Sequence, residues 1–262
     1  MAEDSETPLA EAQSLDDQHE AAAERADLAA LQAALAAGAH RQATSFELPR
    51  LIGQLHEAAS TGDLAALCAA LAAGAAAAVD SRNFNLSSRT ALGRVVDPSN
   101  KRLTAGRRTA CMRALLSAGA WASAPINANS DNSHTALHDA AYLGLYTVCR
   151  LLLDAGVDVN APHTLYRDTY TPLHYAANRS HAERNQKVIA LLLSRGAVDG
   201  PDIDKYESSS YLKKIRAAGG IAKYERQHRA MLVASYTPKF SHLLPPELVS
   251  VVISFWAHVG LY

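Results

Sequence analysis

The amino-acid sequence predicts an all-α solenoid, in which short helix pairs repeat along the chain and stack on one another. Three observations support this prediction. Residues 134–160 contain two apolar stretches with helical spacing, similar stretches recur on both sides of them, and a glycine closes each unit. A single helix pair of this length cannot bury its own apolar faces, so each unit needs neighbours.

The unit at 134–160 shows the pattern most completely. Its apolar residues lie three and four positions apart, which puts them on one face of each helix. They are Leu137, Ala140 and Ala141 in the first helix, and Val148, Leu151 and Leu152 in the second. Gly144 supplies the turn between the two helices. Gly156 follows the second helix where a left-handed residue is needed, a conformation that glycine adopts with little strain.

Four other segments repeat this unit less completely, at residues 28–40, 53–76, 90–120 and 170–198. The first of them retains only a second helix, whereas the next spans 19 positions from Leu55 to Gly74, as Leu137 to Gly156 does. The unit that begins at residue 90 is eight positions longer, and we expect the extra residues between its helices, within residues 97–107.

The unit at 134–160 resembles a complete ankyrin repeat. The resemblance rests on Thr135-Ala136-Leu137-His138, Ala140-Ala141, Gly144, Leu151-Leu152-Leu153 and Ala155-Gly156, and it extends to Thr171-Pro172-Leu173-His174. It implies an ankyrin solenoid over residues 28–200 that acts as a protein–protein interaction scaffold. In this family the hairpin fingers and inner helices form a concave face that binds protein partners, and the histidine of the Thr-Pro-Leu-His element hydrogen-bonds to neighbouring backbone.

The closing glycines indicate lengthened fingers. Gly74, Gly119, Gly156 and Gly196 are spaced by 45, 37 and 40 residues, against an ankyrin period of about 33. Part of each excess falls in the finger, as at residues 161–170. Either the longer finger serves to recognise a partner, or the loop has lengthened by drift without a function. We predict that the partner contacts Asn129, Asp131, Tyr142, Leu143, Tyr166, Arg167, Asn178 and Arg179.

The sequence contains no motif for catalysis, a metal or a cofactor. It has no glycine-rich phosphate loop, nucleophile elbow or paired-carboxylate motif, so we predict no enzyme activity, no cofactor and no small-molecule substrate. The repeat-position histidines are at least one repeat apart, and four others fall on predicted loops without metal-ligand spacing. The first set is His56, His138 and His174, and the second is His134, His163, His181 and His242.

The cysteines and the hydropathy predict an intracellular protein, cytoplasmic or nuclear. Cys68, Cys111 and Cys149 are odd in number, and each lies in a predicted second helix, where it reads as a buried apolar residue. No stretch reaches the roughly 20 strongly apolar residues of a membrane span, so we expect no membrane contact.

The charges are unevenly distributed. Residues 1–27 contain nine acidic groups and one arginine, which predicts an acidic, disordered tail. Residues 82–113 contain eight basic groups and one aspartate, which favours either a solvated insertion or, as an alternative function, a nucleic-acid-associated factor. Phe84 is the segment's one aromatic residue, so stacking on bases is limited and a nucleic-acid partner is disfavoured.

Residues 201–236 predict a helical cap on the stack, with helices at 211–218 and 224–236 and a linker at Thr237-Pro238. Residues 237–262 resemble the opening of an F-box, shortened at the chain end. This resemblance implies docking to the F-box-binding linker subunit of a cullin ubiquitin ligase, with the repeats holding the substrate. The expected docking residues are Leu244, Pro245, Glu247, Leu248, Val252 and Trp256. The alternative is an apolar helix that packs back on the last repeat.

Asn160 raises a separate chemical possibility. Its position resembles the asparagine that an asparaginyl hydroxylase modifies in some ankyrin proteins. The alternative is a structural role, in which Asn160 shapes the start of the finger.

Overall fold

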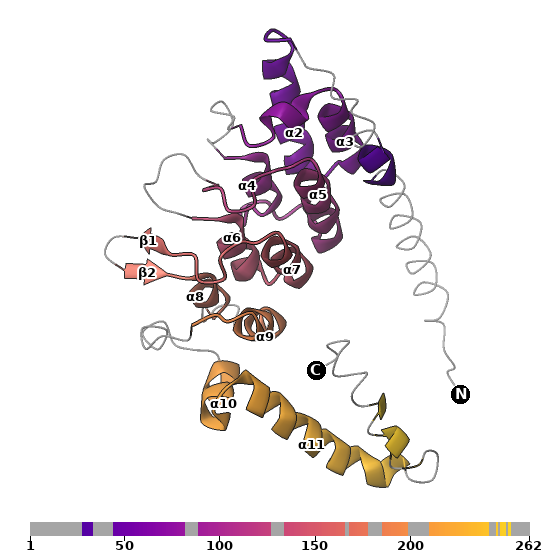
Figure 1. Ribbon diagram of the computed structural model, residues 1–262, viewed down its shortest axis with the longest axis vertical. Coiled ribbons are helices and arrows are strands. Elements are labelled where there is room, and N and C mark those ends of the chain that lie inside the picture. Colours follow the sequence, from indigo (N-terminus) through magenta and orange to yellow (C-terminus); the bar gives the residue numbers. More distant parts are fainter. Residues whose placement is uncertain are drawn as a thin grey trace, which may run out of the picture.

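The computed structural model describes residues 28–33, 44–81, 89–126, 134–165, 168–177, 185–198, 210–240, 245, 247–249 and 251–252. The fold is a mostly helical solenoid of successive helix pairs, as the sequence predicts (Figure 1). The pairs are α2 (Leu48–Thr61) with α3 (Leu64–Ala72), α4 (Ala91–Val95) with α5 (Ala105–Ser117), α6 (Ala136–Leu143) with α7 (Tyr146–Asp154), and α8 (Pro172–Ala176) with α9 (Gln186–Ser194). A 3-10 turn, η1 (Ala75–Ala78), follows α3.

The first helices of the pairs α4, α6 and α8 form one column of the solenoid, and the second helices α5, α7 and α9 form another (Figure 1). A two-stranded antiparallel hairpin projects from the side of the first helices. It consists of β1 (His163–Leu165) and β2 (Asp168–Tyr170), with His163 opposite Tyr170. The finger that the sequence predicts at residues 161–170 is therefore confirmed.

The core runs continuously through the stack, because each helix pair buries its apolar face against the next. Leu137 and Leu152 are fully buried in the central pair. Ala140 and Ala141 are fully buried too, and their small side chains let α6 and α8 approach closely. Gly156 has φ +85, so the left-handed residue that the sequence predicts after the second helix is present.

The long connection between α4 and α5 wraps around the buried side chain of Arg108. This residue is 4 % exposed, and its guanidinium donates hydrogen bonds to four backbone carbonyls. The acceptors belong to Val95, Asp97, Asn100 and Leu103. Burial lowers the pKa of Arg108, and the nearby Asp97 carboxylate opposes that shift. An arginine nevertheless stays charged in proteins, so a buried cation organises the insertion.

The last helices close the stack and correct one predicted boundary. In α10 (Ser210–Ala218), Leu212 and Ile215 are buried in the same core as the repeats. The following helix, α11 (Ile221–Phe240), continues through Thr237 and Pro238, so the predicted linker is wrong. Pro238 lies two residues before the end of α11, so its missing N–H and the contact of its ring with the carbonyl of Ala234 disturb only the last turn.

Among the described residues, none of the helices is both long and apolar enough to cross a lipid bilayer.

Asn185, just before α9, ties two helix pairs together. It is fully buried, and its Nδ2 donates to the carbonyl oxygens of Ala141, Tyr142 and Ala176 at 3.1, 3.2 and 3.2 Å. We expect Asn185→Ala to lower the free energy of unfolding by about 1–3 kcal/mol, because buried carbonyls lose their donor. Urea unfolding measures the change. Lys187→Ala, at an exposed position two residues later, is the control, and an equal loss in both variants contradicts the assignment.

Candidate protein-interaction face

The base of the β1–β2 hairpin is fixed to the neighbouring helices by His138. Its Nδ1 accepts a hydrogen bond from the backbone N–H of Thr135 at 3.2 Å, so its Nε2 carries the proton and donates to the carbonyl of Ala161 at 3.0 Å. Burial, and then the neighbouring His134 and His163, lower the pKa of His138 to about 3. The backbone-bonding role that the ankyrin resemblance implies for this histidine is present here.

A second layer of rings lies directly against His138. The ring of His134 stacks on that of His163, with centroids 4.5 Å apart and planes inclined by 20°. The Nδ1 of His163 lies 2.6 Å from the hydroxyl of Tyr175 on α8. Both His134 and His163 are buried, at 9 % and 6 % exposure. The four rings join the hairpin to α6 and α8 in one contact.

Asp139 adds a buried negative charge beside these rings. Its Oδ1 lies 3.3 Å from His134 Nε2, and its Oδ2 lies 3.1 Å from a guanidinium nitrogen of Arg89. We call His134, His138, Asp139, His163 and Tyr175 the latch cluster. No group of three or more His, Cys, Asp or Glu side chains within the described residues is arranged to hold a metal ion.

The latch cluster differs from what the sequence predicts for these histidines. His163 is the first residue of β1 and does not lie on a loop. It is 29 positions from its stacking partner His134. The hairpin brings the two rings together, and the chain spacing alone gives no signal of that contact. The repeat-position histidines stay apart, as expected, and His56 bonds the Ser81 carbonyl at 3.0 Å.

Beyond its base, the hairpin presents its side chains to solvent. Thr164, Leu165, Asp168 and Thr169 are exposed, and Leu165 retains 39 % of its surface. These residues contribute nothing to the core. The hairpin is thus a projecting element with a fixed base and exposed side chains, which is the arrangement of a recognition finger.

Two of the predicted partner-binding residues lie within the described part of the chain. Tyr142 and Leu143 are half-buried at the C-terminal end of α6. They are four and five residues beyond His138 on the same helix, so they lie about 6 and about 7.5 Å from the hairpin base along its axis. The remaining predicted residues, Asn129, Asp131, Tyr166, Arg167, Asn178 and Arg179, fall outside the described residues.

Asn160 spans two repeats through its side-chain amide. Its Nδ2 donates to the carbonyl of Gly196 at 3.1 Å, and its Oδ1 accepts from the backbone N–H of Val198 at 2.8 Å. These bonds support the structural role that the sequence leaves open for this residue. Hydroxylation of Asn160 stays a prediction, and intact-mass analysis of protein from eukaryotic cells detects the added oxygen.

The basic segment at 82–113 does not form a continuous basic surface. Three of its arginines point inward: Arg94 and Arg108 are buried, and Arg89 pairs with Asp139. Burial lowers the pKa of Arg94. The exposed cations of the segment at 82–113 are Lys101, Arg102, Arg107 and Arg113, among the residues that the structure describes. Arg82 is not among the described residues. Both predicted alternatives, a solvated loop and a nucleic-acid site, assume that the charged side chains of this segment are exposed to solvent. Arg89, Arg94 and Arg108 instead point into the protein.

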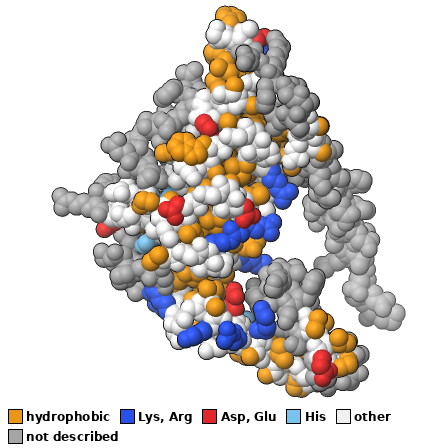
Figure 2. Space-filling model, in the orientation of Figure 1, with side chains coloured by type: hydrophobic (Ala, Val, Ile, Leu, Met, Phe, Trp, Pro, Cys, Tyr) orange, Lys and Arg blue, Asp and Glu red, His pale blue; other side chains and the backbone are white. Residues whose placement is uncertain are grey.

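The exposed basic side chains gather instead at the C-terminal end of the stack. Figure 2 shows Lys and Arg side chains there, over the region where Figure 1 draws α10 and the start of α11. Residues 210–240 contain seven basic residues and a single acidic one, Glu225. The basic residues are Lys213, Lys214, Arg216, Lys223, Arg226, Arg229 and Lys239. This concentration is visible in the sequence, although the denser segment at 82–113 obscures it.

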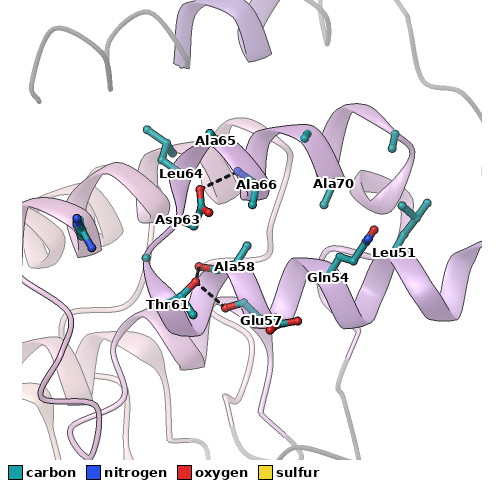
Figure 3. A pocket seen from close by; sticks show the side chains of 14 residues that line it. Leu51, Gln54, Glu57, Ala58, Thr61, Asp63, Leu64, Ala65, Ala66 and Ala70 are labelled. Carbon is teal, nitrogen blue, oxygen red and sulfur yellow. Dashed lines mark hydrogen bonds between the residues drawn. The ribbon is translucent and has the colours of Figure 1, made fainter.

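A groove of about 980 Å³ lies at the other end of the stack, between α2 and α3 (Figure 3). Alanine methyl groups form much of its wall, from Ala58 on α2 and Ala65, Ala66, Ala69, Ala70 and Ala73 on or beside α3. Asp63 at its rim caps α3 by accepting from the N–H of Ala66 at 2.9 Å. Thr61 donates to the carbonyl of Glu57 at 3.1 Å. These bonds serve the helices, so the groove lacks the convergent polar groups of a catalytic site.

Two comparisons with known families decide the identity of the repeats. A model of three ankyrin-repeat copies matches residues 55–163, and a model of many ankyrin copies matches residues 137–193. Residues 55–193 are an ankyrin-repeat domain. Ankyrin repeats are typically non-enzymatic modules that act as protein–protein interaction scaffolds. No curated protein matches the chain.

The three cysteines of the ankyrin domain form no disulfide. All three lie on second helices, as the sequence predicts; Cys111 and Cys149 are buried, as expected, whereas Cys68 is only half-buried. Burial raises the pKa of the Cys149 thiol, so it stays protonated and unreactive near neutral pH.

The C-terminal segment lies beyond residue 193, where both family matches have ended. The backbone N–H groups of Leu248 and Val249 donate to the carbonyl of Pro245, so a helical turn begins there. Val249 is 2 % exposed but is not part of the core shared by the repeats. The alternative that the sequence offers, an apolar helix packed against the last repeat, would place it in that core. Figure 1 draws this turn beside the far end of α11.

The same turn exposes apolar side chains on its outer side. Leu248 and Val251, three positions apart, are 49 % and 62 % exposed, and Val252 is half-buried. Glu247 and Pro245 are exposed as well. Two residues of the predicted docking set, Leu244 and Trp256, lie outside the described residues.

Proposed function

We propose that the ankyrin domain binds a protein partner through its finger face, which we define as the exposed residues of the β1–β2 hairpin together with Tyr142 and Leu143 at the end of α6. The observation that carries the proposal is the hairpin itself. Its base is held by the buried latch cluster, so its position is set before a partner arrives, and binding orders less of the chain. Its outward side chains have no role in the core.

The chemistry of the finger face suits a polar recognition surface with one apolar contact. Threonines and Asp168 can exchange hydrogen bonds with a partner, and Leu165 offers the apolar contact. The sequence adds the tyrosine and arginine that predict anchoring at an interface, Tyr166 and Arg167 between the two strands. We propose that Asn129, Asp131, Asn178 and Arg179 also contact the partner.

Affinity capture from cell extract with mass spectrometry tests the finger face. We expect Leu165→Asp to lower the recovery of a specific partner at least tenfold, because the change places a charge in an apolar contact. Lys187→Glu, which alters an exposed residue of α9 on the side of the second helices, is the control and should leave recovery unchanged. Equal recovery by both variants contradicts a role for the hairpin.

We infer, as a finer proposal, that the C-terminal segment docks a linker subunit of a cullin ubiquitin ligase, so that the chain acts as a substrate adaptor. The F-box resemblance of Leu244, Pro245, Glu247, Leu248, Val252 and Trp256 supports it. The apolar pair Leu248 and Val251, exposed on a short helical turn outside the repeat core, supports it further. An exposed apolar pair of this kind suits docking into a groove.

A pulldown with purified linker and cullin subunits tests the adaptor role. We expect the full chain to retain them, and Leu248→Asp or a chain that ends at Tyr236 to lose them. Met231→Asp is the matched control, since Met231 is 55 % exposed on α11 and lies outside the segment. Absence of the subunits from the full-chain pulldown, or equal recovery by Leu248→Asp, leaves the finger face as a binding scaffold without the ligase connection.

A further inference from the structure

The latch cluster brings titratable groups of α6, β1 and α8 together. The ring of His163 on β1 contacts those of His134, just before α6, His138 on α6 and Tyr175 on α8. Asp139 on α6, Arg89 before α4, Tyr170 on β2 and His174 on α8 lie around these rings. His134, His138, Asp139 and His163 are each less than one-tenth exposed, whereas Tyr175 is half-buried. A proton taken up by one of the buried histidines is therefore only weakly screened by water.

The contacts fit neutral imidazoles. Burial raises the pKa of Tyr175 to about 12, so its phenol keeps its proton and can donate to the Nδ1 of His163 at 2.6 Å. His138 likewise accepts at Nδ1 and donates at Nε2, which only the neutral ring can do. The bonds of His138 require an uncharged imidazole, and the bond between His163 and Tyr175 is compatible with one.

Protonation of His138 removes the acceptor of the Thr135 N–H, and protonation of His163 reverses the direction of its bond to Tyr175. A proton on Nδ1 of His163 turns that atom into a donor, so the Tyr175 hydroxyl must rotate its own hydrogen away. The charged ring also lies 4.5 Å from the ring centroid of His134 and 5.7 Å from that of His138. Asp139 offsets part of this charge, but Arg89 already occupies one of its oxygens at 3.1 Å.

We propose that the β1–β2 hairpin is an acid-released finger: uptake of protons by the latch cluster frees it from α6 and α8 while the helix pairs stay stacked. The stacked pairs keep their contacts because a continuous apolar core joins them, and because the amide ties of Asn160 and Asn185 between them do not titrate. Release of the hairpin stands on the geometry of the cluster alone. The further consequence, that acid discharges a bound partner, rests on the proposed function.

The sign of the pH dependence follows from the direction of the shifts. Burial lowers the pKa of His163, with a further lowering from His134 and an opposing effect of Asp139. The pKa of His138 is lowered to about 3. A released hairpin lets these residues return towards the ordinary histidine value of about 6.5, so the open state binds more protons. Latching is complete above that pH and weakens as the pH falls below it.

Hydrogen exchange of the full chain between pH 7.5 and 5.0, corrected for the intrinsic rate, tests the proposal. We expect protection of the hairpin amides to fall by up to about tenfold per pH unit below 6.5 for each linked proton, while α7 and α9 stay protected. His163→Gln retains a hydrogen-bond acceptor without a titrating ring, and it should reduce or abolish this pH response. His228→Gln, on α11, is the control and should respond as the wild type does.

Constant hairpin protection over this pH range in the wild type overturns the proposal, as does an unchanged pH response in His163→Gln. If His163→Gln unlatches the hairpin at every pH, His134→Gln serves as the second variant, since it leaves the bond between His163 and Tyr175 in place. Its pH response should then be smaller than that of the wild type, and an equal response counts against the cluster. The exchange experiment contains no partner, so its outcome is independent of whether the finger face binds one.

Discussion

Arg108→Met lowers the free energy of unfolding by about 3–5 kcal/mol, because it removes a buried cation from the backbone carbonyls arranged around it. Arg108 is 4 % exposed, and its guanidinium serves carbonyls from α4, from the insertion and from Leu103. Methionine fills the volume of the aliphatic stem but donates no hydrogen bond. The insertion between α4 and α5 should loosen first, since its backbone depends on this one side chain.

Chemical unfolding followed by circular dichroism measures the loss, and Arg113→Met is the matched control. Arg113 lies on the same helix and is exposed, so its replacement should change stability by no more than about 0.5 kcal/mol. A loss below 1 kcal/mol for Arg108→Met would mean that water can replace the guanidinium, and that the insertion is not organised around it.

Leu152→Ala has the second largest expected effect, a loss of about 2–5 kcal/mol. Leu152 is fully buried on α7, and α7 packs against both α5 and α9. The cavity therefore weakens two repeat interfaces at once, and in a solenoid the stability of each repeat depends on its neighbours. We expect a lower unfolding midpoint and a broader transition, as the repeats on either side of α7 begin to unfold separately.

Leu165→Ala is the matched leucine truncation for this prediction. Leu165 retains 39 % of its surface and lies outside the core, so its removal should leave the unfolding midpoint nearly unchanged. Equal midpoints for Leu152→Ala and Leu165→Ala would contradict a core that runs continuously through the stack.

The sequence predicts the repeat fold well because its signals are local. Each helix pair shows its apolar spacing within about 20 residues, and glycines such as Gly156 mark the ends of second helices. The same reasoning locates the insertion between α4 and α5. The distance from Leu92 to Gly119 exceeds that in the complete repeat by eight residues, and the connection between the two helices can accommodate them. Pro238 is an exception: the proline predicts that the helix ends before it, but α11 extends two residues beyond it.

The latch cluster could not be predicted in the same way. His134 and His163 are 29 residues apart, and their stacking depends on the direction in which the hairpin leaves the stack. The burial of Arg108 is equally non-local, because charge counting along the chain treats every arginine as exposed. Two features of the candidate site were within reach of the sequence: the hairpin, from the excess length before the helix at 172–176, and the turn at Pro245.

Site-specific photo-cross-linking tests most directly the claim that the finger face binds a protein partner. A photoreactive amino acid at Thr164, which is exposed on β1, is compared with one at Arg150, which is exposed on α7 in the column of second helices. After irradiation in cells, we expect a discrete cross-linked protein from position 164 and none from position 150. A partner captured only from position 150, or equally from both, would contradict the assignment of the finger face.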